Sequence, residues 1–326
     1  MRSNGSNLIG FIETAFRSIP RSVDAIQVSR EDRMTYLANE YTFQRLDLWF
    51  IAPSPVACEF LANILKESNR TARAMHFATN VSRVLAQSPG TRSSMLQGWI
   101  GWIYEFERSV TTGFRNNMSP NDIGDCLKAH LELLALKASL MNGIFGYLVL
   151  RDALPKFLSL VATDSNLLIE QHNGGMVISF HRIINTHRYE LTKFAVHDVL
   201  TVLLLGVPLL VEYGYDGDHE PENPMFEWIH GIPATFLEVM AQINSRRTGS
   251  RVRLDDWQTL EERVLFWKSR YAMLNDAPVP GSDDAERVAV QEGWRHLLLI
   301  YIYMDVKEIY RVYVELRRMI HESKGQ

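Results

Sequence analysis

The chain has 326 residues, of which 46% are hydrophobic and 22% charged, a composition typical of a soluble globular protein with one large domain or two ordinary ones. Lys and Arg number 34 against 38 Asp and Glu, and the resulting formal net charge of −4 argues against a chain that grips phosphate backbones by itself. The two cysteines, Cys58 and Cys126, are too few for a disulfide framework or a cysteine-based zinc module.

Apolar residues at helical spacing dominate the N-terminal part. Ser29 is a suitable N-cap for a helix whose apolar positions run from Met34 to Leu48. Pro53 and Pro55 are expected to end that helix and begin the next. Three further helices are expected, at residues 56–65, 74–85 and 96–106. The first two of these are separated from the third by Pro89-Gly90, which we expect to close the helix before it.

The segment Ser119-Pro120-Asn121-Asp122 predicts a strong helix start. Ser can cap the helix, Pro suits the first helical position, and Asp favours the positive end of the helix dipole. The apolar run that follows extends through Leu148 as one long helix. Gly143 and Gly146 are tolerated inside it where another helix approaches closely. Pro155 is expected to restart the chain.

Helical spacing returns between Leu191 and Val202, and the residues from Tyr213 to Pro224 form the clearest loop. Further helical segments are expected, at residues 226–229, 236–240 and 257–271. After a second loop, a final helix is predicted from Ala285 to about Ile320. Met176 to Phe180 is the one short run with an ambiguous, strand-like pattern.

Two apolar stretches invite comparison with membrane spans. Residues 131–150 contain Glu132, Lys137 and Asn142, and residues 199–211 are too few for the about 20 apolar residues that a span needs. Both are therefore expected to be buried core helices, with no membrane partner. The N-terminus lacks the apolar core and cleavage site of a signal peptide, so we expect an intracellular, reducing compartment.

Three histidines, His181, His187 and His197, lie close together in sequence. A zinc pair on a helix needs an i, i+4 spacing so that both rings share a face. A spacing of six instead leaves the first two rings about 120° apart around a helix. Ordinary packed histidines are therefore favoured over a metal site or an enzyme built on these residues.

Acidic residues alternate along the clearest loop, at Asp216, Asp218, Glu220 and Glu222. This is similar to the start of a calcium loop, and Glu227 stands at the twelfth position, where such a loop carries its bidentate carboxylate. The sixth position, which needs glycine for a sharp turn, is Pro221. A solvated acidic loop is therefore favoured over a calcium site.

Four arginines form the most basic patch of the chain, at Arg246, Arg247, Arg251 and Arg253. Such a patch can serve as a nuclear-localisation or phosphate-contacting element. Cations also suit helix C-termini, and Asp255-Asp256 follows at once, so a solvated helix end is the favoured interpretation.

Sequence templates for catalysis are missing from the chain. It has no G-x-x-x-x-G-K-[ST] loop, no G-x-G-x-x-G and no G-x-S-x-G elbow. Cys58 and Cys126 each sit in an apolar helical context typical of inert packing. We therefore expect no enzyme, no cofactor, and no catalytic, metal-binding or DNA-binding residue, and the pattern assigns no ligand-binding residue.

Three stretches taken together resemble a known helical domain. The first runs from Tyr189-Glu190-Leu191 through Phe194, His197-Asp198 and Gly206-Val207-Pro208 to Leu210-Val211-Glu212-Tyr213. The second comprises residues 226–233, Ile243-Asn244 and Arg246, and the third comprises Glu292-Gly293-Trp294-Arg295 and residues 299–304. Their order and spacing resemble the regulatory domain of fungal binuclear zinc-cluster transcription factors, the second type of fungal-specific transcription factor domain. Tyr41, Leu46, Trp49-Phe50 and the Pro53/Pro55 break also fit, so the resemblance covers most of residues 30–310.

The resemblance implies a nuclear regulator of RNA polymerase II transcription whose helical domain binds an effector or a protein partner of the transcription machinery. The six-cysteine module that reads DNA in that family is missing from these residues, so no direct nucleic-acid binding is expected. The expected fold is all-α, an irregular array of about ten helices, with an N-terminal segment at 1–29 and the helical domain at 30–326. The alternative is a helical small-ligand-binding or scaffold protein with no transcriptional role, for which cytoplasm replaces nucleus.

Overall fold

The computed structural model of the chain describes residues 33–42, 50, 55–85, 89–112, 118–171, 174–216, 227, 230–273 and 283–323. The architecture is predominantly helical, as predicted, with one small sheet. The expected segment 1–29 and the Ser29 cap lie outside the described residues, as do the prolines at 53 and at 221. Within the described part, no helix offers the long apolar stretch that crossing a bilayer takes.

The N-terminal part follows the predicted pattern closely. Residues 33–42 are helical. Three helices follow, α3 (Pro55–Glu67), α4 (Asn69–Leu85) and α5 (Pro89–Thr112). Pro55 and Pro89 both stand at a helix start, where the missing N–H has no intrahelical partner to lose. The expectation that Pro89-Gly90 closes the helix before it is therefore wrong, since these residues begin α5.

The central hairpin consists of α6 (Pro120–Leu140) and α7 (Gly143–Val161). Ser119 caps α6 as predicted, because its side chain accepts a hydrogen bond from the Asp122 amide. The single long helix expected here is wrong, because Asn142 caps a second helix by accepting from the Phe145 amide. Pro155 lies inside α7 and does not restart the chain.

The two helices of this hairpin pack closely at Gly146. A Cβ atom added there would come within 3.1 Å of the Ala138 Cβ, which is tighter than ordinary van der Waals contact. The close helix approach predicted at this glycine is confirmed, although the approaching helix is the neighbour in sequence.

A small mixed sheet follows the hairpin. After a 3₁₀ turn, η2 (Ser165–Leu167), strand β1 (Leu168–Glu170) pairs antiparallel with β2 (Met176–Ser179). The short strand β3 (Tyr213–Gly214) pairs parallel with β2, so that Ile178 lies opposite Tyr213. The ambiguous run at 176–180 is thus a strand, and it leads directly into α8 (Phe180–Asn185).

Helix α9 (Tyr189–Leu205) ends at Gly206, whose φ of 67° is the left-handed conformation that glycine adopts easily. The apolar stretch 199–211 is therefore half helix and half extended chain, not the single core helix expected. Phe194 of α9 stacks on Phe157 of α7 with ring centroids 4.2 Å apart, which joins α9 to the central hairpin.

The C-terminal part comprises α11 (Ala234–Arg247), α12 (Trp257–Phe266), α13 (Arg270–Met273) and α14 (Asp283–Ser323). The last of these confirms the predicted final helix. The apolar pattern from 257 to 271 does not form one helix, because Trp267–Ser269 are not helical and separate α12 from α13.

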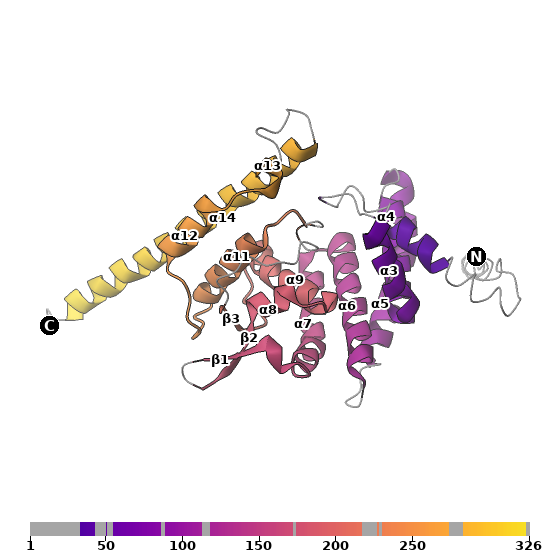
Figure 1. The fold of residues 1–326 in the computed structure, drawn as a ribbon, viewed down its shortest axis with the longest axis horizontal. Helices are drawn as coiled ribbons and strands as arrows, with labels where there is room; N and C mark the ends of the chain where they lie inside the picture. The colour runs from indigo at the N-terminus through magenta and orange to yellow at the C-terminus, as the bar shows by residue number, and fades with distance from the viewer. Residues whose placement is uncertain are drawn as a thin grey trace, which may run out of the picture.

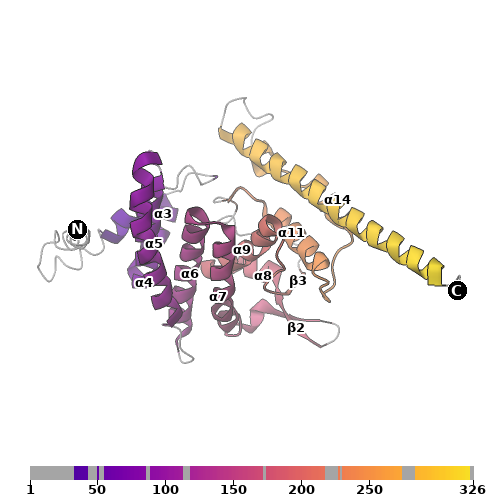
Figure 2. The same ribbon diagram turned by 180° about the vertical axis from the view of Figure 1, so that it is seen from behind.

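The helices are arranged in sequence order along the molecule (Figure 1). The N-terminal helices lie at one end, α6, α7 and α9 in the middle, and α11 to α14 at the other end. Figure 2 shows from behind that α14 lies along the outer edge and projects past the other helices towards the C-terminus. Buried apolar side chains from Ala38 to Ile302 belong to a common core cluster.

Candidate ligand-binding site

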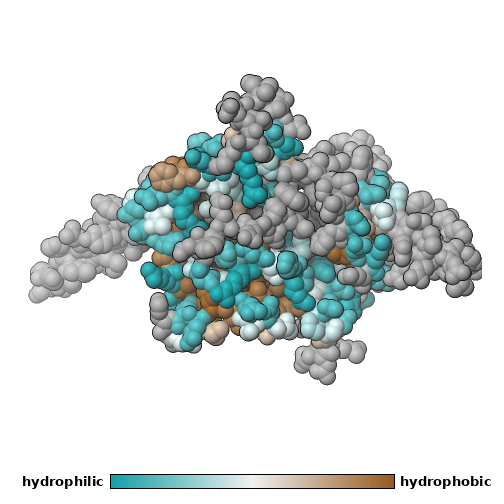
Figure 3. All heavy atoms as spheres, in the orientation of Figure 1, coloured by the Kyte–Doolittle hydropathy of each residue, from teal (hydrophilic) through white to brown (hydrophobic). Residues whose placement is uncertain are grey.

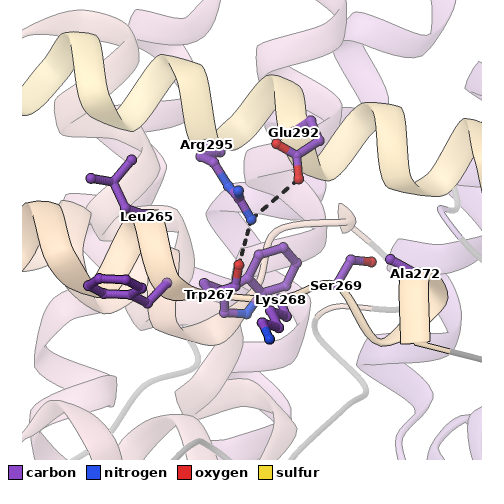
Figure 4. A pocket seen from close by; sticks show the side chains of 8 residues that line it. Leu265, Trp267, Lys268, Ser269, Ala272, Glu292 and Arg295 are labelled. Carbon is purple, nitrogen blue, oxygen red and sulfur yellow. Dashed lines mark hydrogen bonds and ion pairs between the residues drawn. The ribbon is translucent and has the colours of Figure 1, made fainter.

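A surface hollow lies where the connection between α12 and α13 meets α14 (Figure 4). Its volume is about 400 Å³, within the range of small-ligand sites. It is lined by Leu265, Phe266, Trp267, Lys268, Ser269, Ala272, Glu292 and Arg295. Because α12 ends at Phe266, the extended residues that follow place the Trp267 carbonyl and the Ser269 hydroxyl against the first half of α14.

Arg295 is the central polar group of this hollow. Its Nη2 donates to the Trp267 carbonyl at 2.5 Å and lies 3.3 Å from Glu292 Oε1. The guanidinium also lies over the Trp267 ring, 5.7 Å from the ring centroid. The Arg295 Nε is buried and has no hydrogen-bond partner in the structure.

The apolar wall comes from the end of α12. Phe266 is 77% exposed and Leu265 is 48% exposed, which is unusual for large apolar residues next to a hollow. Trp267 behind them is buried and packs against Phe236 of α11 with ring centroids 4.7 Å apart. Figure 3 shows apolar surface gathered over the region of α12 and α14, in the upper left of the view.

A buried polar chain fixes the opposite wall. Ser269 Oγ donates to Gln291 Oε1 at 2.5 Å, and Gln291 Nε2 donates to Glu227 Oε1 at 2.8 Å. Arg270 adds an ion pair of 3.7 Å to Glu227. This chain holds the start of α13 against α14, so the hollow has a fixed shape on this side.

The charges around the hollow favour an anionic ligand. Lys268 and Arg295 are two cations against one carboxylate, Glu292, and the apolar wall of Phe266 and Leu265 stands beside them. A molecule with an apolar or aromatic body and one acidic group matches this arrangement.

This hollow was not predictable from the sequence pattern. Glu292 and Arg295 belong to the third stretch of the resemblance, but the apolar seam at 257–271 predicted a helix through Trp267 and Ser269. The extended connection depends on the buried chain to Gln291 and Glu227, and on Trp267 packing against α11. Both are contacts between distant residues that spacing along the sequence does not reveal.

The three histidines occupy different elements. His181 is in α8, His187 lies between α8 and α9, and His197 is in α9. His181 Nε2 is 3.1 Å from the Asn185 side-chain amide nitrogen. In the part of the chain that the structure describes, no three His, Cys, Asp or Glu side chains are placed to hold a metal ion.

Of the acidic residues compared with a calcium loop, the structure describes Asp216 and Glu227. Asp216 accepts from Ser179 Oγ at 2.5 Å and pairs with Arg182 at 3.0 Å, while Glu227 is buried in the chain with Gln291. Both carboxylates thus have protein partners. The other acidic residues of the loop, at 218, 220 and 222, lie outside the described residues.

The basic patch divides into separate roles. Arg246 pairs with Asp305 of α14 at 3.4 Å, and Arg247 lies over the Tyr301 ring at 4.9 Å. Both are in the last turn of α11, as the helix-end interpretation expects. Arg251 and Arg253 follow the helix and are exposed. Two of the four arginines therefore join α11 to α14 and are not a free phosphate-binding surface.

The two thiols differ in their environment. Cys58 is partly buried and Cys126 fully buried, and both are free. Burial raises the pKa of the Cys126 thiol even though Arg70 Nη1 lies 3.3 Å from the sulfur. Burial also lowers the pKa of the nearby His130 to about 4, so this ring stays neutral at physiological pH. The expectation that Cys126 is a packing residue agrees with this environment.

The three stretches of the resemblance meet at one buried residue, Asn244. Its Nδ2 donates to the Val199 carbonyl of α9 at 3.0 Å, and its Oδ1 accepts from the Tyr301 hydroxyl of α14 at 2.7 Å. Asn244 is fully buried, so both hydrogen bonds form away from water. The structure thus joins α9, α11 and α14 into one unit whose outer side carries the hollow.

Comparison of the chain with protein-family models, with curated proteins and with solved structures finds no match.

Proposed function

We propose that this chain is the regulatory domain of a fungal RNA polymerase II transcription regulator and acts by binding a small effector or a protein partner. These 326 residues contain no six-cysteine DNA-reading module. The proposal rests on the resemblance of the three stretches. The observation that best supports an effector is the hollow between the α12–α13 connection and α14, where the third stretch supplies Glu292 and Arg295.

The lining of the hollow supports an amphipathic organic anion as the effector class. Phe266 and Leu265 offer apolar contact, while Lys268 and the Arg295 guanidinium supply positive charge. Asn244 of α11 is hydrogen-bonded to both α9 and α14. Through these two bonds, a ligand bound in the hollow beside α14 can alter the positions of α9 and α11. That coupling is what a regulatory domain needs.

Binding can be tested with 8-anilinonaphthalene-1-sulfonate, a fluorescent aromatic anion, titrated into the full chain. We expect one saturable site, with the Kd raised about tenfold by Phe266→Ala and several-fold by Lys268→Ala. Leu204→Ala is the matched control, because Leu204 is 76% exposed against 77% for Phe266 and lies on α9, away from the hollow. Equal affinities for all four proteins would contradict an effector site here.

The transcriptional role is tested by fusing the chain to an unrelated DNA-binding domain in a yeast reporter strain. We expect reporter output to differ from that of the DNA-binding domain alone, and Phe266→Ala to alter that difference. If reporter output with the fusion equals that of the DNA-binding domain alone while dye binding is intact, the alternative of a small-ligand-binding protein with no transcriptional role is favoured.

The lack of a six-cysteine DNA-binding module in these residues leads to a separate prediction. Duplex DNA should bind the purified chain weakly, if at all, and with an affinity that falls steeply with salt, because only phosphate contacts are available. A mobility-shift titration at two salt concentrations measures this. Tight, sequence-dependent binding would contradict the proposal.

A further inference from the structure

The outward side of α14 is uncharged over four turns. Among residues 289–304, the exposed positions are Ala289, Val290, Gly293, His296, Leu297, Ile300, Tyr303 and Met304. Ile300 is 60% exposed and Met304 is 52% exposed. A helix face open to water normally carries Lys, Arg, Asp or Glu, so this face has the composition of a contact surface.

Five of these positions form a heptad seam. Val290, Gly293, Leu297, Ile300 and Met304 follow one another at spacings of three, four, three and four residues. This is the a/d pattern by which one helix packs along another. We call these five residues the α14 seam.

Among the described residues, the contacts to α14 lie on its other sides. Leu298, Tyr301 and Ile302 are buried in the core, and Tyr303 hydrogen-bonds to Glu261 of α12. On a helical wheel the α14 seam lies about 80° to 160° from Leu298, on the side away from α12. Both ribbon views place α14 at the edge of the molecule (Figures 1 and 2).

We propose that the α14 seam is a homodimer interface, in which two copies of this chain pair through antiparallel α14 helices around a two-fold axis between Leu297 and Ile300. The inference is independent of the proposed transcriptional role. Two-fold pairing of identical surfaces is the commonest form of association among soluble proteins.

Antiparallel pairing makes the seam complementary to itself in size. In this register Leu297 lies opposite Ile300 of the second copy, and Gly293 opposite Met304 of the second copy. The long Met side chain then meets the position without a side chain, where an added Cβ on Gly293 would find open space within this copy. Such large-to-small matching lets two helices approach closely.

The same register also matches charge. Continued along the sequence, the heptad positions before and after the seam include Glu286, Lys307 and Arg311. The antiparallel register sets position 286 opposite position 311 of the second copy, which pairs Glu with Arg. A parallel pairing would set each of these three charges against its own copy, so charge favours the antiparallel arrangement.

The area is that of a weak, reversible pair. Covering the exposed apolar side chains of the seam and its neighbours removes on the order of 500 Å² from water on each copy, or about 1,000 Å² in total. That is at the lower end of specific interfaces, so we expect a dimer with a micromolar Kd.

Sedimentation equilibrium on the full chain tests the proposal. Between about 1 and 100 µM we expect conversion from monomer to twice the 37.5 kDa chain mass. Ile300→Glu should weaken the dimer about 100-fold, because it places two carboxylates near the axis, while Leu204→Glu, a matched exposed position on α9, should leave it unchanged. A wild-type chain that stays monomeric at about 100 µM overturns the proposal, as does a dimer that survives Ile300→Glu.

A charge exchange tests the register and guards against loss of folding. Glu286→Arg and Arg311→Glu should each weaken the dimer about fivefold, and the double variant should restore it. Residues 286 and 311 are seven turns apart on one helix, so only pairing between copies can produce this rescue. Absence of rescue would overturn the antiparallel register, with circular dichroism confirming that each variant is folded.

Discussion

Asp198 is a buried residue whose chemistry departs far from its behaviour in water. Its carboxylate accepts hydrogen bonds from the Leu210 amide at 2.9 Å and from the Tyr213 hydroxyl at 3.2 Å, so it ties the chain after α9 back onto the helix. Burial raises the pKa of this carboxyl to about 7, against the opposing effect of the hydrogen bonds. The same residue therefore fixes the turn and makes the fold sensitive to pH.

The sign of this sensitivity is fixed by linkage. An exposed Asp titrates near 3.9, so between about pH 4 and pH 7 the folded chain keeps a proton that the unfolded chain has released. The contribution of Asp198 to the free energy of unfolding is thus full below about pH 4 and falls by at most about 1.4 kcal/mol per pH unit up to about pH 7. We expect Asp198→Asn to flatten this decline in urea unfolding, and Asp152→Asn, at a 53% exposed side chain, to leave it unchanged. A decline of equal slope in both variants would contradict the assignment.

The sequence could not show that Asp198 is buried and bonded in this way. Helical spacing placed the apolar residues of α9 correctly, but it treated 199–211 as one continuous helix. The actual turn at Gly206, which brings Leu210 and Tyr213 back to Asp198, depends on a left-handed glycine and on pairing of Tyr213 with β2. Contacts of that range are set by tertiary packing and not by local preference.

The starts of α6 and α7 differ in how well neighbouring residues in the sequence predict them. The start of α6 was predictable because Ser119, Pro120 and Asp122 each satisfy a separate requirement of a helix N-terminus. The break before α7 was not, since apolar spacing continues through Phe145 and Leu148 and only the cap at Asn142 marks the new helix. A cap inside an apolar pattern is easy to miss, because Asn is also common on exposed helix faces.

The cap of α6 gives a prediction about a single element. Ser119→Ala removes the acceptor for the Asp122 amide at 3.2 Å, and we expect the free energy of unfolding to fall by about 1 kcal/mol. Ser119→Thr keeps a hydroxyl that accepts from the Asp122 amide and donates to the Asp122 carboxylate, so it should restore stability. Thermal or urea unfolding of the three proteins measures this. An Ala variant as stable as the wild type would show that the cap does not contribute to the free energy of unfolding.

Across the whole molecule, one buried ion pair joins the N-terminal helices to the centre. Glu132 of α6 bonds to Lys193 of α9, and its other oxygen accepts from the hydroxyl of Tyr41, in the helix at 33–42, at 2.9 Å. Desolvation would lower the pKa of Lys193, but the adjacent Glu132 charge raises it overall, so the lysine stays cationic. Three segments that are far apart in sequence therefore depend on a single carboxylate.

Removal of that carboxylate should affect the entire fold. Glu132→Gln leaves the Lys193 charge buried without its partner, and we expect a loss of about 3–5 kcal/mol in the free energy of unfolding. The double variant Glu132→Gln, Lys193→Met removes both charges and should recover much of this loss. Chemical denaturation provides the measurement, and a single variant that is as stable as the double variant would contradict the pair's role.

The length of α14 has a consequence for anything attached to its end. Its 41 residues rise about 60 Å along one straight axis, and the two-fold axis proposed near Leu297 lies closer to the start than to the end of the helix. The two copies of Ser323 in such a dimer would point in opposite directions, about 70 Å apart. Two cargoes or two labels fixed to these ends would be held at a set separation, and α14 would act as a molecular ruler.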